Sequence, residues 1–183
     1  MAYLLRALIV LINAGFFITF LSAKGVITFE KFHHIHLAIP SYLLMIFVQA
    51  FVMFFFIGCS RLGENVHTIL FSKENKLSEL FDEIPHDLAP YKKEVTKLNS
   101  QLLVHKRQVI PHVMLIICLA TLGFLLGGAH DTNLVGKNIH QGAIYGLLVA
   151  LILGSIREWI HLGKNHRLLR ELKGLFQIPD SSM

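Results

Sequence analysis

The sequence predicts an all-α protein, a four-transmembrane-helix bundle with a cytoplasmic helical hairpin between helices 2 and 3 and a C-terminal amphipathic helix. Two observations lead to this fold class. Hydrophobic residues make up 54% of the chain and charged residues only 16%, which is far more apolar than a soluble domain. Four apolar runs are each long enough to cross a hydrocarbon core about 30 Å thick as a helix. We therefore expect residues 1–183 to form a single integral membrane domain.

The apolar runs that define the predicted transmembrane helices cover residues 2–22, 37–59, 109–129 and 139–160. The first run resembles a signal peptide, but Leu21 fits poorly at the minus-three position of a cleavage site. We expect this run to be retained as a helix. Asn13, Gln49 and His112 are polar residues within the runs. For each of them we expect a structural hydrogen bond, in preference to a place in a transport path for Asn13, a catalytic role for Gln49 and a ligand role for His112.

The hairpin is predicted over residues 60–108, where the apolar spacing of the second helix continues to about Phe71. A short amphipathic helix is expected around Leu77 to Ile84, where apolar residues recur at helical spacing. Pro90 then begins a helix with a heptad-like apolar stripe that leads into the third transmembrane run. Residues 161–177 carry leucines among basic residues, which predicts an amphipathic helix on the inner membrane surface or on the hairpin.

Two pairs of glycines, each four residues apart, lie in the outer halves of the third and fourth helices. They are Gly123 with Gly127 and Gly142 with Gly146. Small residues at this spacing let two helix backbones approach closely in a membrane. We therefore predict that these two glycine faces meet and hold the loop between helices 3 and 4.

The basic residues set the orientation. Lys24, Lys31 and Lys137 are the ones that fall in the two short connections, and the rest lie at the N-terminus, between helices 2 and 3, or after helix 4. Because cytoplasmic loops collect Lys and Arg, both termini should be cytoplasmic, and a bacterial inner membrane is the expected location. The basic residues behind the net charge of +5 then lie beside lipid headgroups, so the predicted partner is the bilayer and not nucleic acid.

Histidines gather at the opposite, periplasmic surface. With two carboxylates they give seven potential metal ligands in two short loops, and imidazole and carboxylate groups suit copper, zinc or iron. The predicted metal ligands are His33, His36, Asp131 and His140, with Glu30, His34 and His130 as alternates. We expect this surface to hold a transition metal ion.

Two other interpretations stay open. Histidine is tolerated at headgroup level, so the cluster is also consistent with a purely structural membrane protein without metal. His36 and His140 are alternatively the axial pair of a haem b in an electron-transfer subunit. No catalytic motif is found, which points away from an enzyme acting alone. The predicted function is that of a subunit of a larger membrane assembly or homo-oligomer, which binds a metal or supports a redox partner.

Overall fold

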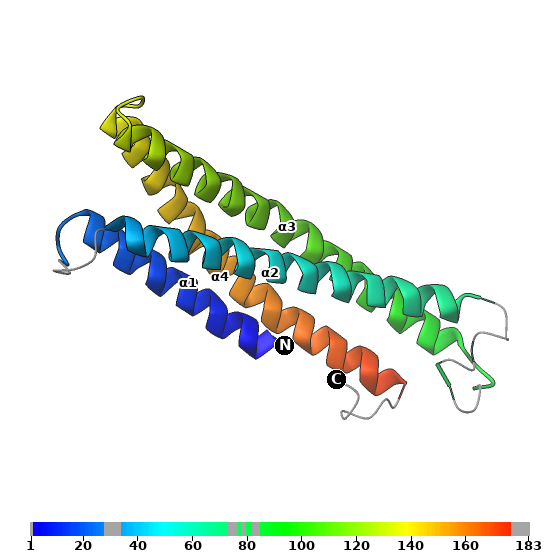
Figure 1. Ribbon diagram of the computed structural model, residues 1–183. Helices are drawn as coiled ribbons and strands as arrows, with labels where there is room; N and C mark the ends of the chain where they lie inside the picture. The colour runs from blue at the N-terminus through cyan, green and yellow to red at the C-terminus, as the bar shows by residue number, and fades with distance from the viewer. Residues whose placement is uncertain (1, 28–33, 73–76, 78–79, 82–84, 177–183) are drawn as a thin grey trace. The chain divides into compact units, whose positions relative to one another are not determined.

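The computed structural model describes residues 2–27, 34–72, 77, 80–81 and 85–176. These residues form four helices: α1 (Ala2–Ala23), α2 (His34–Leu70), α3 (Ala89–Asp131) and α4 (Lys137–Leu175), shown in Figure 1. All four are long and apolar enough to cross a membrane. The described residues contain no strand. The all-α fold class and the four membrane-spanning candidates are thus confirmed.

Three helices continue beyond the apolar runs that predicted them. α2 extends past residue 59 to Leu70, and α3 begins at Ala89, which confirms the predicted helix start near Pro90. α4 runs without a break to Leu175, so residues 161–175 continue the fourth helix instead of forming a helix of their own. The short amphipathic helix predicted around Leu77 to Ile84 falls mostly outside the described residues.

Two helices end in the same hydrogen-bonded motif. Beyond α1, Gly25 adopts a φ of 71° and the Val26 N–H donates to the Leu21 carbonyl at 3.0 Å. Beyond α3, Asn133 adopts a φ of 60° and the Leu134 N–H donates to the Ala129 carbonyl at 2.9 Å. Glycine and asparagine are the residues that reach this left-handed conformation most easily. Both turns therefore satisfy carbonyls that the helix end would leave without a partner.

The chain divides into two compact units. Unit 1 comprises Met1–Met53 and Val109–Ile160, and unit 2 comprises Phe54–Gln108 and His161–Met183. α1 belongs to unit 1 alone, whereas α2, α3 and α4 each contribute residues to both units.

Polar side chains inside unit 1 pair between helices. Asn13 of α1 donates from Nδ2 to Ser155 Oγ of α4 at 2.8 Å. Arg157 of α4 donates from Nη1 to His112 Nε2 of α3 at 3.0 Å. Gln49 of α2 is fully buried, and its Nε2 lies 3.5 Å from a carboxylate oxygen of α4. These contacts confirm the predicted interhelical hydrogen bonds, which matter most where no water can replace them.

The prediction that two glycine faces meet is half wrong. A Cβ on Gly123 would lie 3.1 Å from Ile144 Cδ1, and one on Gly127 would lie 3.2 Å from His140 Cε1, so α3 does use its glycines against α4. Gly142 and Gly146 are exposed, with no atom within 4 Å of an added Cβ. α4 instead presents the larger side chains of Ile144 and His140 to the glycines of α3.

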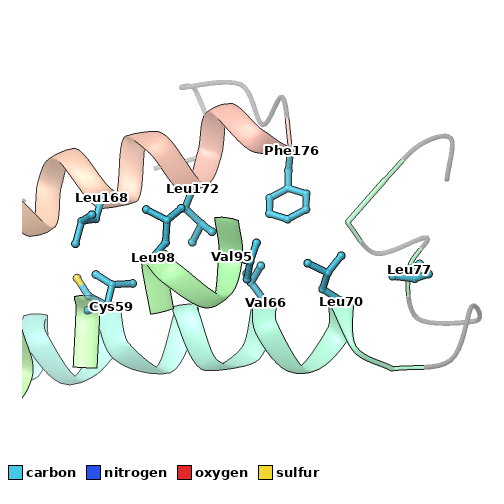
Figure 2. Packing of buried hydrophobic residues seen from close by; sticks show 10 residues of the cluster. Cys59, Val66, Leu70, Leu77, Val95, Leu98, Leu168, Leu172 and Phe176 are labelled. Atoms are coloured by element: carbon cyan, nitrogen blue, oxygen red, sulfur yellow. The ribbon is translucent and has the colours of Figure 1, made fainter. Parts of the chain in front are cut away.

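Unit 2 has an apolar core built from three helices, as Figure 2 shows. Leu168 and Leu172 belong to this core and point from α4 toward side chains of α2 and α3. The contributions of α2 and α3 are Cys59, Val66, Leu70, Val95, Leu98 and Leu102. The heptad-like stripe predicted for α3 therefore faces the core, and the leucines of residues 161–175 pack on the α2 and α3 segments of this unit.

Gly63 marks a close approach of α2 and α3 in unit 2. An added Cβ would lie 2.9 Å from Leu102 Cδ1 and 3.0 Å from Asn99 Oδ1. Gly58 lies on the same helix but is exposed, with no atom within 4 Å of an added Cβ. The two positions form a matched pair for testing this contact.

We expect Gly63→Val to lower the free energy of unfolding by about 1–3 kcal/mol relative to Gly58→Val, because only the first substitution overpacks the contact. The change in helix propensity is the same at both sites. Unfolding of the purified protein in detergent, followed by circular dichroism, measures the difference. Equal stability of the two variants would contradict the close approach of α2 and α3.

Candidate ligand cavity

Unit 1 contains a cavity of about 390 Å³. Its walls come from the last turns of α1 and α3 and the first turns of α2 and α4, so it lies where α1 connects to α2 and α3 connects to α4. This volume is within the range of about 300–1,000 Å³ that is usual for small-molecule sites.

The inner part of the cavity is apolar. Met45, Ala120 and Leu147 line it and are almost completely buried. Aromatic rings from Phe16 and Phe124 line it as well. This lining is suited to a hydrocarbon group, because burying apolar surface is favourable and no charge lies among these five side chains.

The hydroxyl groups in the wall already have partners. The hydroxyls of Thr19 in α1 and Ser41 in α2 lie 3.0 Å apart, and the Thr19 hydroxyl also donates to the Gly15 carbonyl at 2.9 Å. The Tyr42 hydroxyl lies 3.4 Å from the Thr121 hydroxyl, and the Tyr42 ring stacks on Phe124 with centroids 4.5 Å apart. These contacts fix the positions of the helices around the cavity and leave its interior apolar.

The rim of the cavity is polar and basic. It carries Lys24, Lys137, His130, Asp131, His140 and Gln141. Lys24 donates to the Tyr145 hydroxyl at 2.6 Å, and its Nζ lies 5.0 Å from the centroid of the Tyr145 ring. Two lysines against one aspartate give the rim a positive balance even when both histidines are neutral.

The two rim histidines lie beside each other. The rings of His130 and His140 are stacked, with centroids 6.0 Å apart and planes at 17°. His130 Nδ1 lies 3.2 Å from the Val135 carbonyl, which can only accept, so Nδ1 carries the hydrogen. In its neutral form His130 therefore has Nε2 as its acceptor nitrogen.

The structure brings together part of the predicted metal site. Asp131 and His140 share the cavity rim with the alternate ligand His130. His36 lies in the first turn of α2, is exposed, and is absent from the residues that line the cavity. The remaining predicted ligands lie outside the described residues: Glu30 and His33 entirely, and His34 for its side chain.

The described part of the chain gives the metal hypothesis no support. Among the residues that the structure describes, no three His, Cys, Asp or Glu side chains come together as a metal would require. Copper, zinc or iron at this surface, and a haem b held by His36 and His140, therefore stay predictions.

Several cavity residues could not be singled out from the sequence. Lys24 falls in a predicted short connection, and Tyr145 lies in the predicted run 139–160. The sequence shows only that both lie toward the same end of the predicted bundle, Lys24 just after the run 2–22 and Tyr145 within the first two turns of its own run. Their contact joins residues 121 positions apart, which a single sequence does not reveal.

Comparisons with protein-family models, with curated proteins and with solved structures found no match for this chain.

If the rim holds a transition metal, protein purified without chelator or affinity nickel will contain about one equivalent of copper, zinc or iron. Asp131→Ala and His140→Ala will each lower this content, because each removes one of the few ligands that a metal needs. Elemental analysis with an optical spectrum measures metal and haem together. A metal content that is the same in all three proteins would show that these residues bind no metal.

Proposed function

We propose that this protein is an integral membrane protein that binds a single-chain lipid with an anionic head group in the cavity of unit 1. The observation that carries this proposal is the division of the cavity into an apolar interior and a basic rim. A ligand that satisfies both parts must itself be amphipathic. Four helices able to span a membrane give such a ligand access from the bilayer.

The apolar interior supports a hydrocarbon chain as the buried part of the ligand. Met45, Ala120 and Leu147 offer neither a donor nor an acceptor side chain, and the nearby hydroxyls are engaged with each other. A polar group placed here would lose its hydration without compensation. A hydrocarbon chain loses nothing by entering.

The basic rim supports an anionic head group. Lys24 and Lys137 supply two ammonium groups, and His130 and His140 add imidazole nitrogens. Asp131 opposes one of these positive charges and leaves room for one net negative charge from the ligand. A carboxylate or phosphate at this place would gain charge-assisted hydrogen bonds. A quaternary ammonium head group would meet the lysines instead and be repelled.

The distribution of basic residues supports an orientation for this cavity. The ends of the helices that form the cavity carry few lysines and no arginine, whereas residues 60–108 and the C-terminal part of α4 carry several lysines and arginines. Under the positive-inside rule both chain termini are cytoplasmic and the cavity faces the periplasm. The protein would then bind lipid in the outer leaflet.

The hypothesis of a subunit in a larger assembly or homo-oligomer is compatible with this activity. Large apolar side chains such as Leu125, Leu153 and Phe54 are exposed in the described part of the chain. Either acyl chains of the bilayer or another subunit can cover these side chains. Their exposure therefore does not distinguish a single chain in lipid from a subunit of an assembly. A transition metal at the rim would compete with the lipid head group for His130 and His140.

The interior of the cavity is tested by filling it. Ala38→Trp places a large ring at a half-buried position of the wall, and we expect it to weaken binding of a fluorescent fatty acid by about tenfold or more, or about 1.4 kcal/mol. Titration of the protein in phosphatidylcholine nanodiscs measures the affinity. Ala7→Trp, at an exposed position of α1 outside the cavity, is the control and should bind as the wild type does. Equal affinities of all three proteins would refute the site.

The rim is tested by comparing a fatty acid with the fatty alcohol of the same length. Lys24→Gln combined with Lys137→Gln should weaken binding of the ionised acid and leave the neutral alcohol unaffected, because only the acid gains from the lysines. Lys164→Gln, an exposed lysine in unit 2, is the control. If the double variant weakens both ligands equally, the rim does not select an anionic head group.

A further inference from the structure

A buried carboxyl group lies elsewhere in unit 1, outside the cavity. Glu158 of α4 is completely buried, and so is Gln49 of α2. The two side chains meet through Gln49 Nε2 and Glu158 Oε2, which lie 3.5 Å apart. Neither residue lines the lipid cavity, so this pair requires an explanation of its own.

No described cation neutralises Glu158. Ion pairs among the described residues include those of Lys97 with Glu94 and of Arg167 with Glu171, and neither involves Glu158. Among the charged or titratable groups on these helices, Arg157 donates to His112 of α3 and Arg6 of α1 donates to the Trp159 carbonyl at 3.1 Å. His161, one turn further along α4, is buried, and the centroid of its ring lies 4.9 Å from that of His105 of α3. α2 contributes the uncharged Gln49. An ionised carboxylate would thus be buried without a counter-charge, which is strongly unfavourable.

Two oxygens in this pair have no hydrogen-bond partner among the described residues. They are Glu158 Oε1 and Gln49 Oε1. If Glu158 is ionised, these two oxygens cannot hydrogen-bond to each other, since both are acceptors. A proton on Glu158 Oε1 makes this atom a donor, and Gln49 Oε1 is then available as its acceptor. The amide would then donate to the carboxyl oxygen Oε2 while the carboxyl group donates to the amide oxygen.

We propose that Glu158 and Gln49 form a proton-binding site between α4 and α2, in which Glu158 holds a proton at neutral pH and shares it with the Gln49 amide oxygen. The ligand is the proton alone. Loss of this proton places an unpaired charge between two packed helices and weakens their contact. The site gives the membrane-spanning part of the chain a means of responding to proton concentration that does not depend on lipid binding.

Infrared spectroscopy of the purified protein tests the proposal directly, because a protonated carboxyl group has a carbonyl stretching band that a carboxylate lacks. At neutral pH the wild type should show this band, and labelling with glutamate carrying ¹³C in the side-chain carboxyl group should shift it. Glu158→Gln should abolish it. Glu94→Gln, which removes a partly exposed carboxylate paired with Lys97, should leave it unchanged.

The partner is tested with Gln49→Leu, which removes the acceptor and should shift the band to higher frequency. A wild-type protein with no glutamate-dependent band at neutral pH would overturn the proposal, and this result needs no variant to fold. The same band in Glu158→Gln as in the wild type would overturn it as well.

Discussion

Inside a bilayer no water is present to replace a missing hydrogen bond, and this constraint determines how the helices of unit 1 are joined. Each polar side chain in an apolar run must find its partner on another helix. Asn13 finds Ser155, and His112 finds Arg157, so α1 and α3 are each fastened to α4 by a polar contact. The lipid-facing surfaces can then consist of apolar side chains, which do little to determine which helices pack together. A few polar pairs thus set which helices are neighbours.

The two proposed sites lie where the described side chains leave a space unfilled or a polar atom without a partner. At the loop end of unit 1 the apolar walls line a space that no described side chain fills, and the described residues of the rim include more basic than acidic groups. Between α2 and α4, Glu158 and Gln49 have oxygens that lack donors. A lipid would fill the cavity, and a proton would supply the missing hydrogen bond between Glu158 and Gln49. The two sites involve different residues, so either can be disabled while the other is kept.

The helices were predictable because their signal is local. Apolar runs give the membrane-spanning segments, and the heptad-like stripe correctly placed Val95, Leu98 and Leu102 in the core of unit 2. The cavity was not predictable, since it depends on contacts such as that between Lys24 and Tyr145. The predicted contact of Gly142 and Gly146 with α3 was wrong, because their spacing shows that they share a helix face but does not show what that face contacts. Of the predicted ligand cluster, the described residues place His130, Asp131 and His140 at the cavity and His36 outside it.

We propose that the cavity of unit 1 holds a lipid with an anionic head group. Native mass spectrometry of the protein, extracted gently from the membrane in which it is made, measures what the cavity retains. Our account predicts one acidic lipid per chain that persists after the bulk lipids and detergent have been removed and is enriched over its abundance in the membrane. A chain that carries no lipid, or carries lipids in the proportions of the surrounding membrane, would contradict it.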